Sequence, residues 1–142
     1  MKYLLILFFL FPSIVFAATE KQIVAAVIIC EAGGEGEKGM QAVANVISNR
    51  AAKGKTPLKV VTQKHQFECI TKNLNDLENF VNKASKHPKW SQALNLSEKI
   101  ANKSLVDITG GSTHFHNTSM TPYWAKKIQF KVKIGGHLFY KE

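Results

Sequence analysis

One stretch near the N-terminus decides how this chain folds: Thr19-Glu20-Lys21-Gln22-Ile23-Val24-Ala25-Ala26-Val27-Ile28-Ile29-Cys30-Glu31-Ala32-Gly33-Gly34. Thr19 followed by Gln22 three positions later is a capping-box pattern, which predicts that a helix begins near Glu20. Apolar residues then recur at helical spacing, at Ile23, Val24, Val27 and Ile28. The pair Gly33-Gly34 predicts the end of the helix.

The next position on this apolar stripe is a carboxylate, Glu31. Three effects disfavour its ionisation: partial burial, the negative end of the helix dipole, and repulsion from Glu35 and Glu37. A carboxyl group that keeps its proton near neutral pH can act as a general acid. The alternative is that Glu31 turns outward as an ordinary carboxylate at the end of a helix.

The first 17 residues have the pattern of a secretory signal peptide. Met1-Lys2 is a short basic start, residues 3–16 are almost wholly apolar, and Val15-Phe16-Ala17 suits signal peptidase. The run is short for a membrane span. We therefore expect cleavage after Ala17, no stable membrane span after cleavage, and export to the periplasm, cell envelope or extracellular space. Residues 18–142 are long enough for one domain and too short for two.

The charge pattern indicates the class of partner. The net charge is +9 and lysines are spread along the chain, whereas Arg50 is the only arginine. Dispersed lysines suit an anionic polymer better than base readout, which uses Arg, Asn and Gln at base edges. For an exported protein, cell-envelope material is the expected partner and nucleic acid is not. The protein is expected to be a monomer.

Cys30 and Cys69 are the two cysteines of the chain. In an oxidising compartment they could form a disulfide, and the alternative is two separate buried thiols. A nucleophilic role is disfavoured for Cys30, because a helix C-terminus raises the pKa of a thiol.

The order of expected elements defines the fold class. Helices are expected over residues 40–51, 76–84 and 88–105, with a short turn or helix over 58–62 and an extended segment over 65–70. Strands are expected over 112–116, 128–134 and 137–140, with Gly135-Gly136 as a two-residue turn. Helices followed by a small antiparallel sheet make an α+β domain.

Three histidines near the C-terminus raise the question of a metal site. His114 and His116 share a face of the expected strand, and with His137 and Glu31 they could surround zinc. A His-x-His pair alone is a weak signal. We favour histidines that hydrogen-bond within a groove or the core, and we expect no metal and no cofactor.

A longer pattern resembles a known family. Glu31-Ala32-x-Gly34-Glu35-x5-Gln41-Ala42-Val43-Ala44-x-Val46-Ile47-x-Asn49-Arg50 is similar to the opening signature of the cell wall hydrolases of the SleB-like (spore-cortex-lytic enzyme) family. The similarity continues in the family's order through Val60-Val61, Gln66-Phe67, Thr113-His114-Phe115-His116-Asn117 and Trp124 to Ile134-Gly135-Gly136-His137-Leu138-Phe139-Tyr140. In one departure, Gly33 stands where the family commonly has an arginine.

The resemblance implies a small lysozyme-like fold and a lytic transglycosylase that cleaves peptidoglycan glycan strands between muramic acid and glucosamine. It implies that Glu31 is the general acid and base, and Glu35 is the obvious second carboxylate. The residues expected to orient the sugar or the acid are Gln66, Thr113, His116, Asn117 and Tyr140. Two alternatives stay open: a peptidoglycan amidase or peptidase using zinc or a Cys–His pair, and a non-catalytic wall-binding module.

Overall fold

Helices come first in the chain and strands last, which confirms the predicted α+β class. The computed structural model describes residues 17–142, so the predicted signal peptide lies outside the described residues except for its last position. The helices are α1 (Glu20–Ala32), α2 (Gly36–Ala51), α3 (Pro57–Thr62), α4 (Glu68–Thr71), α5 (Leu77–Ser85) and α6 (Trp90–Ala101). The strands are β1 (His114–Asn117), β2 (Gln129–Ile134) and β3 (His137–Lys141), with a short 3-10 helix, η1 (Tyr123–Lys126), between β1 and β2.

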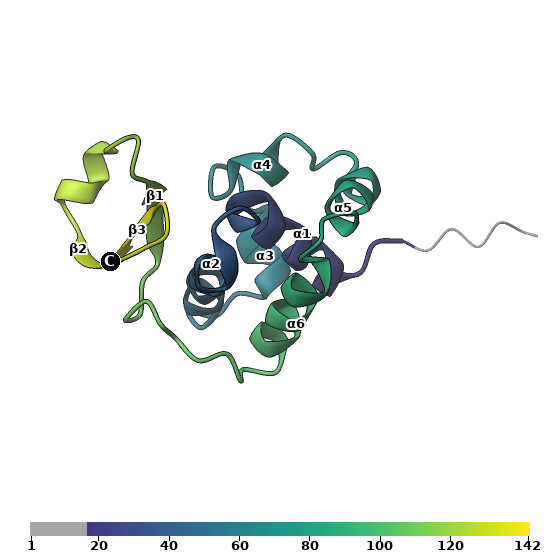
Figure 1. Cartoon of the computed structure of the whole chain (residues 1–142), viewed down its shortest axis with the longest axis horizontal. Coiled ribbons are helices and arrows are strands. Elements are labelled where there is room, and N and C mark those ends of the chain that lie inside the picture. The colour runs from purple at the N-terminus through teal and green to yellow at the C-terminus, as the bar shows by residue number, and fades with distance from the viewer. Residues whose placement is uncertain (1–16) are drawn as a thin grey trace, which may run out of the picture.

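Helix α1 is the centre of the helical body, and α2 to α6 all contact it (Figure 1). Its start is the predicted capping box: Thr19 N–H donates to Gln22 Oε1 at 2.8 Å, and Gln22 N–H donates to Thr19 Oγ1 at 3.3 Å. The expected single apolar stripe is too narrow, because residues 23–29 are all buried. A helix that is covered on every side is a core helix.

The segment over residues 65–70 is not extended, so that prediction is wrong. His65 has a positive φ of 63°, and the chain turns there before entering the single turn of α4. Phe67 at the start of α4 is fully buried in the main core. A short segment with few apolar residues can satisfy either a strand or a turn, and here the burial of one aromatic ring decides between them.

Two helix boundaries also differ from the prediction. Helix α2 begins at Gly36, where φ is 76°, four residues before the expected start. Helix α6 ends at Ala101 instead of Leu105, because Lys103 takes a left-handed conformation with φ 59°. The turn after α6 leads into the long connection to β1.

The three strands form one antiparallel sheet in the order β1-β3-β2. Strand β3 pairs with both neighbours, so that Phe139 lies opposite Phe115 on one side and Val132 on the other. The alternation predicted for 128–134 is interrupted, since Phe130 pairs with Tyr140 and Val132 with Phe139, which leaves Lys131 as an extra residue. Gly135 has a φ of 57° in the tight turn between β2 and β3, as a two-residue hairpin turn requires.

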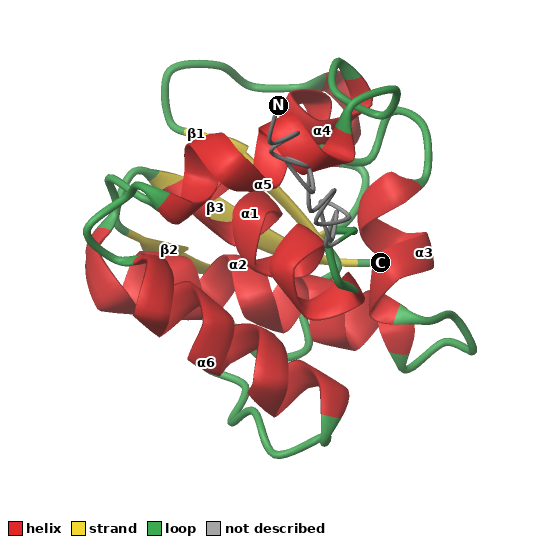
Figure 2. Ribbon diagram, turned by 90° about the vertical axis from the view of Figure 1, so that its right-hand side faces the viewer, coloured by secondary structure: helices red, strands yellow, loops and turns green. Residues whose placement is uncertain are grey.

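The sheet lies on one side of the helical body, against α2 (Figures 1 and 2). A second, smaller core fills this junction: Ala42, Val46 and Phe139 are fully buried there. Polar side chains of α2 hold the connection that leads into β1. Asn45 donates to Val106 O at 3.0 Å, Asn49 donates to Ser112 O at 3.0 Å, and Gln41 also donates to Val106 O, at 2.9 Å.

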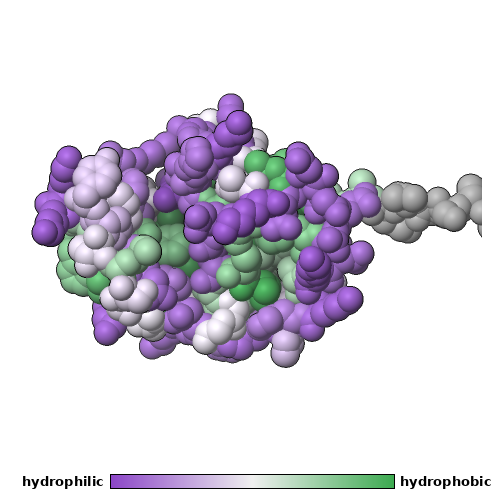
Figure 3. Space-filling view, turned by 90° about the horizontal axis from the view of Figure 1, so that it is seen from above, coloured by the Kyte–Doolittle hydropathy of each residue, from purple (hydrophilic) through white to green (hydrophobic). Residues whose placement is uncertain are grey.

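The face seen in Figure 3 is mainly hydrophilic, with smaller hydrophobic areas between the charged side chains. Met120, Tyr123 and Phe130, three of the exposed large hydrophobic residues, lie between the end of β1 and the first half of β2. Within residues 17–142, none of the helices combines the length and apolar character needed to cross a membrane.

Candidate active site

Glu31 lies in the last turn of α1 and is half-buried. The Cys69 thiol, from α4, donates a hydrogen bond to Glu31 Oε1 at 3.1 Å. The carboxylate therefore does not turn freely into solvent: it is held against α4, the element whose conformation the sequence did not predict.

Both cysteines are free thiols in this structure, Cys30 exposed and Cys69 half-buried. The Cys69 thiol lowers the pKa of the Cys30 thiol, while burial and the charge of Glu31 act in the opposite direction. The same interaction raises the pKa of the Cys69 thiol, and burial and the charge of Glu31 raise it further. Cys69 therefore remains protonated and available as a donor to Glu31.

Arg50, at the end of α2, is a cation whose pKa is influenced by the charge of Glu31. Its Nε donates to Thr113 O at 2.6 Å, and its guanidinium lies 5.2 Å from the centroid of the Phe67 ring. Burial lowers the pKa of Arg50, and the negative charge of Glu31 acts in the opposite direction. Arg50 therefore contacts both β1 and the start of α4, and its charge and that of Glu31 influence each other.

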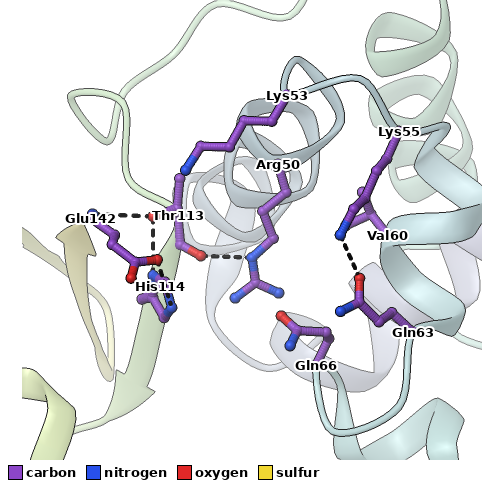
Figure 4. A pocket seen from close by; sticks show the side chains of 9 residues that line it. All are labelled: Arg50, Lys53, Lys55, Val60, Gln63, Gln66, Thr113, His114 and Glu142. Atoms are coloured by element: carbon purple, nitrogen blue, oxygen red, sulfur yellow. Dashed lines mark hydrogen bonds and ion pairs between the residues drawn. The ribbon is translucent and has the colours of Figure 1, made fainter.

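Two adjoining pockets share Arg50, Gln66 and His114 as lining residues, and they have volumes of about 210 and 340 Å³. The first also includes Thr113, and the end of Arg50 points between Thr113 and Gln66 (Figure 4). The second reaches Trp124 and His65. We call the two together the Arg50 groove. Glu31 does not line either pocket, and its link to them is through Arg50 and α4.

His116 and Tyr140 form a buried pair behind Trp124. Their rings stack with centroids 5.3 Å apart, and His116 Nε2 lies 3.0 Å from the Tyr140 hydroxyl. His116 Nδ1 lies 2.8 Å from Asn117 O, and since a carbonyl only accepts, Nδ1 donates this hydrogen bond, while Nε2 faces the Tyr140 hydroxyl. The edge of Trp124 meets both rings. The pair therefore supports the aromatic wall of the groove.

Glu35 has a different environment from Glu31. Its Oε2 accepts a hydrogen bond from Gly136 N–H at 2.6 Å, which joins the start of α2 to the turn between β2 and β3. A side chain at Gly135 would collide with this carboxylate, because a Cβ atom there would lie 2.5 Å from Glu35 Oε2. The arrangement makes Glu35 the attachment point of the hairpin.

The predicted site residues are thus divided among three places. Gln66 and Thr113 line the Arg50 groove, His116 and Tyr140 stand behind its aromatic wall, and Asn117 is exposed at the end of β1, where its side chain accepts from Ser119 N–H at 2.8 Å. Sequence reasoning did not assign Arg50 or Cys69 to the site. The signal for Arg50 was present, since it is the single arginine of a lysine-rich chain.

The histidines do not gather into a metal site. His114 and His116 point their rings toward Trp124, and His137 packs edge-on against Phe115. Within residues 17–142, no group of three or more His, Cys, Asp or Glu side chains is arranged to hold a metal ion.

The fold and the site together define a class of protein. It is a mainly helical α+β domain with a half-buried carboxylate at the end of its core helix and a cationic groove with an aromatic wall. The chain belongs to the cell wall hydrolase family, whose pattern matches residues 34–140. The matched range begins just after Glu31 and includes Glu35.

Two solved structures are similar to this one. The catalytic domain of the germination-specific lytic transglycosylase SleB from Bacillus anthracis has a TM-score of 0.66 and 24% identity, covering 92% of this chain and 100% of that chain. The catalytic domain of the Bacillus cereus SleB protein has a TM-score of 0.61 and 25% identity, covering 90% of this chain and 94% of that chain. The comparison with curated proteins gave no match.

Proposed function

We propose that this protein is a lytic transglycosylase that cleaves peptidoglycan glycan strands between N-acetylmuramic acid and N-acetylglucosamine, with Glu31 as acid and then base. The observation that carries the proposal is the half-buried carboxylate of Glu31, held by the Cys69 thiol at 3.1 Å at the end of the core helix. Membership of the cell wall hydrolase family supports the substrate. The fold shared with Bacillus anthracis SleB, itself described as a lytic transglycosylase, supports the reaction.

In the first step, protonated Glu31 donates its proton to the glycosidic oxygen, and the bond from C1 of muramic acid to that oxygen breaks. The glucosamine side leaves with a hydroxyl, and C1 takes on oxocarbenium character. In the second step, the Glu31 carboxylate removes the proton from the C6 hydroxyl of the same sugar while its oxygen attacks C1. A 1,6-anhydro ring closes, Glu31 regains its proton, and no water is consumed.

One carboxylate is enough for this sequence of steps, because the nucleophile is the sugar's own hydroxyl. We therefore assign Glu35 a positioning role, since its Oε2 already accepts from Gly136 N–H at 2.6 Å. Gln66 and Thr113 would orient the sugar from the Arg50 groove, and Trp124, supported by His116 and Tyr140, would pack against a sugar face. The substrate lies outside the cytoplasm, so the proposal requires export of the protein.

The test is mass spectrometry of the products released from purified sacculi by the wild type and by Glu31→Gln. The wild type should release anhydro-muropeptides, and Glu31→Gln should slow their release by about 10²- to 10⁴-fold, the usual contribution of general acid–base catalysis. Glutamine keeps an oxygen that can accept from Cys69, so the fold should persist. Glu78→Gln, which makes the same change at an exposed carboxylate on α5, is the matched control and should retain activity.

Other products would identify other chemistry. Muropeptides with reducing ends would mean hydrolysis with water as the nucleophile. Free peptides with an intact glycan would mean an amidase or peptidase and would overturn the proposal. Unchanged binding to sacculi with no product from any variant would mean a wall-binding module.

A further inference from the structure

We propose that the Arg50 groove binds a carboxylate carried by a muramic acid residue of the glycan strand. The proposal rests on the proposed function, because it assumes that the strand is the substrate. It adds a charged subsite for a part of the strand that takes no part in the proton transfers at Glu31 or in the attack on C1.

The first observation is the shape of the site. The smaller pocket has a volume of about 210 Å³, which suits a short side branch better than a whole disaccharide, and it adjoins the larger pocket beside Trp124. Its walls come from the end of α2, the loop after α3 and the start of β1. A strand lying along the aromatic wall could therefore place a substituent in the smaller pocket.

The second observation is the charge of this pocket. Arg50, Lys53 and Lys55 line it, against a single carboxylate, Glu142 (Figure 4). Glu142 Oε2 lies 3.9 Å from His114 Nε2, a contact that is an ion pair only when His114 is protonated, so the count is three cations to one carboxylate. Among residues 17–142, no carboxylate lies within ion-pair distance of any of the three cations. The pocket therefore holds an excess of positive charge.

The third observation is the state of Arg50 itself. Its Nη1 is buried and has no hydrogen-bond acceptor among the described residues. Taking a guanidinium out of water without a counter-charge is costly, and burial accordingly lowers the pKa of Arg50. The cations Arg50 and Lys53 also lower the pKa of His114, after burial as the main cause, which reports the same positive field. An incoming anion would relieve both costs.

The chemistry of the strand limits what that anion can be. The sugar rings of the two residues are neutral, and each carboxylate hangs from the lactyl ether of muramic acid, either as the free lactyl acid or on an attached peptide. Arg50 Nε already donates to Thr113 O, so a carboxylate would take charge-assisted hydrogen bonds from the Nη groups of the guanidinium. The lactyl acid and the peptide acid present the same group, so the pocket could accept either.

The test uses Lys53→Glu. The Lys53 side chain is exposed and makes no hydrogen bond within residues 17–142, so the substitution breaks no such contact. Lys99→Glu on α6 is the matched control, since it makes the same change in net charge at an exposed position outside the groove. Retention of each variant by sacculi is measured by co-sedimentation, together with KM and kcat for product release. The substrates are peptide-bearing sacculi, strands stripped of peptide, and both after amidation of their carboxylates.

Lys53→Glu should bind untreated substrate about fivefold more weakly than Lys99→Glu, with the loss in KM, as expected when a partly exposed attraction becomes a repulsion. On amidated substrate the two variants should be equal. A loss on peptide-bearing sacculi alone identifies the peptide acid, a loss on stripped strands alone identifies the free lactyl acid, and a loss on both shows that the pocket accepts either carboxylate. Equal behaviour of the two variants on every untreated substrate would overturn the proposal. Co-sedimentation gives this answer even if no glycan is cleaved, so failure of the proposed function is recognised separately.

Discussion

The helical body and the sheet are held in place by different physical forces. The helical body surrounds α1, whose residues 23–29 are all buried, so apolar burial dominates it. The sheet meets α2 through a core of three fully buried residues and is otherwise attached by hydrogen bonds, from Asn45 and Asn49 to the connection before β1 and from Gly136 to Glu35. Glu31 belongs to the first region, while much of the Arg50 groove comes from the second. Glu31 therefore lies on the helical body, which apolar burial holds together. The aromatic wall of the Arg50 groove lies on the sheet side, which polar contacts attach.

The largest expected effect comes from truncating one isoleucine to alanine in each of the two regions. Ile28→Ala, in the fully buried centre of α1, should lower the free energy of unfolding by about 2–5 kcal/mol, the usual cost of a cavity in a packed core. Ile134→Ala, partly buried at the end of β2, should cost about half as much or less, because the site can relax toward solvent. Denaturant unfolding of both variants measures the difference. Equal losses would show that the sheet carries as much stability as the helical body.

The attachment of the hairpin is tested at Glu35. Glu35→Ala leaves Gly136 N–H without its partner and should cost about 1–3 kcal/mol, with a loss of activity as the hairpin shifts. Glu35→Gln keeps an oxygen acceptor and should restore most of both. If Glu35 were instead a second catalytic carboxylate, Glu35→Gln would be folded and as inactive as Glu31→Gln.

A smaller effect is expected in the connection that leads into the sheet. Burial alone would raise the pKa of Asp107, but hydrogen bonds from Thr109, Gly111 and Asn49 outweigh it and lower the pKa below its usual value. A carboxyl whose pKa is lowered on folding contributes stability above its unfolded pKa and loses it as the pH falls through the folded value. Asp107→Asn should therefore cost up to about 1 kcal/mol near pH 7, since Asp107 is largely exposed, and less at an acid pH below the folded pKa of Asp107. Unfolding curves at both pH values measure this, with Asp76→Asn as a second capping carboxylate for comparison.

The smallest test concerns the thiols beside Glu31. Cys30 is exposed and its pKa is lowered by the Cys69 thiol, whereas the pKa of Cys69 is raised. Iodoacetamide at mildly alkaline pH should therefore label Cys30 well before Cys69, and Cys69→Ala should slow the labelling of Cys30 severalfold. Peptide mass spectrometry reads the order. Labelling of Cys69 first, or a protein without reactive thiols before reduction, would contradict the free-thiol arrangement.

The sequence predictions were accurate where the signals are local and wrong where the structure depends on distant contacts. The helix over residues 20–32 was predictable because its cap, apolar content and glycine stop all lie within one short stretch. The hairpin was predictable because alternation and a Gly-Gly turn are also local signals. The turn at His65 and the helix α4 could not be predicted, because the burial of Phe67 beneath Arg50 depends on residues distant in sequence.

By itself, the sequence determined the α+β order, the exposed cationic character and the position of Glu31 at the end of the first helix, because each depends on neighbouring residues or on composition. The tertiary structure alone decided that Cys69 holds Glu31, that Glu35 holds the hairpin, and that Arg50 Nη1 finds no hydrogen-bond acceptor among residues 17–142. These three facts join side chains from separate elements. Such contacts are set by how helices and strands pack, and no spacing along the chain encodes them directly.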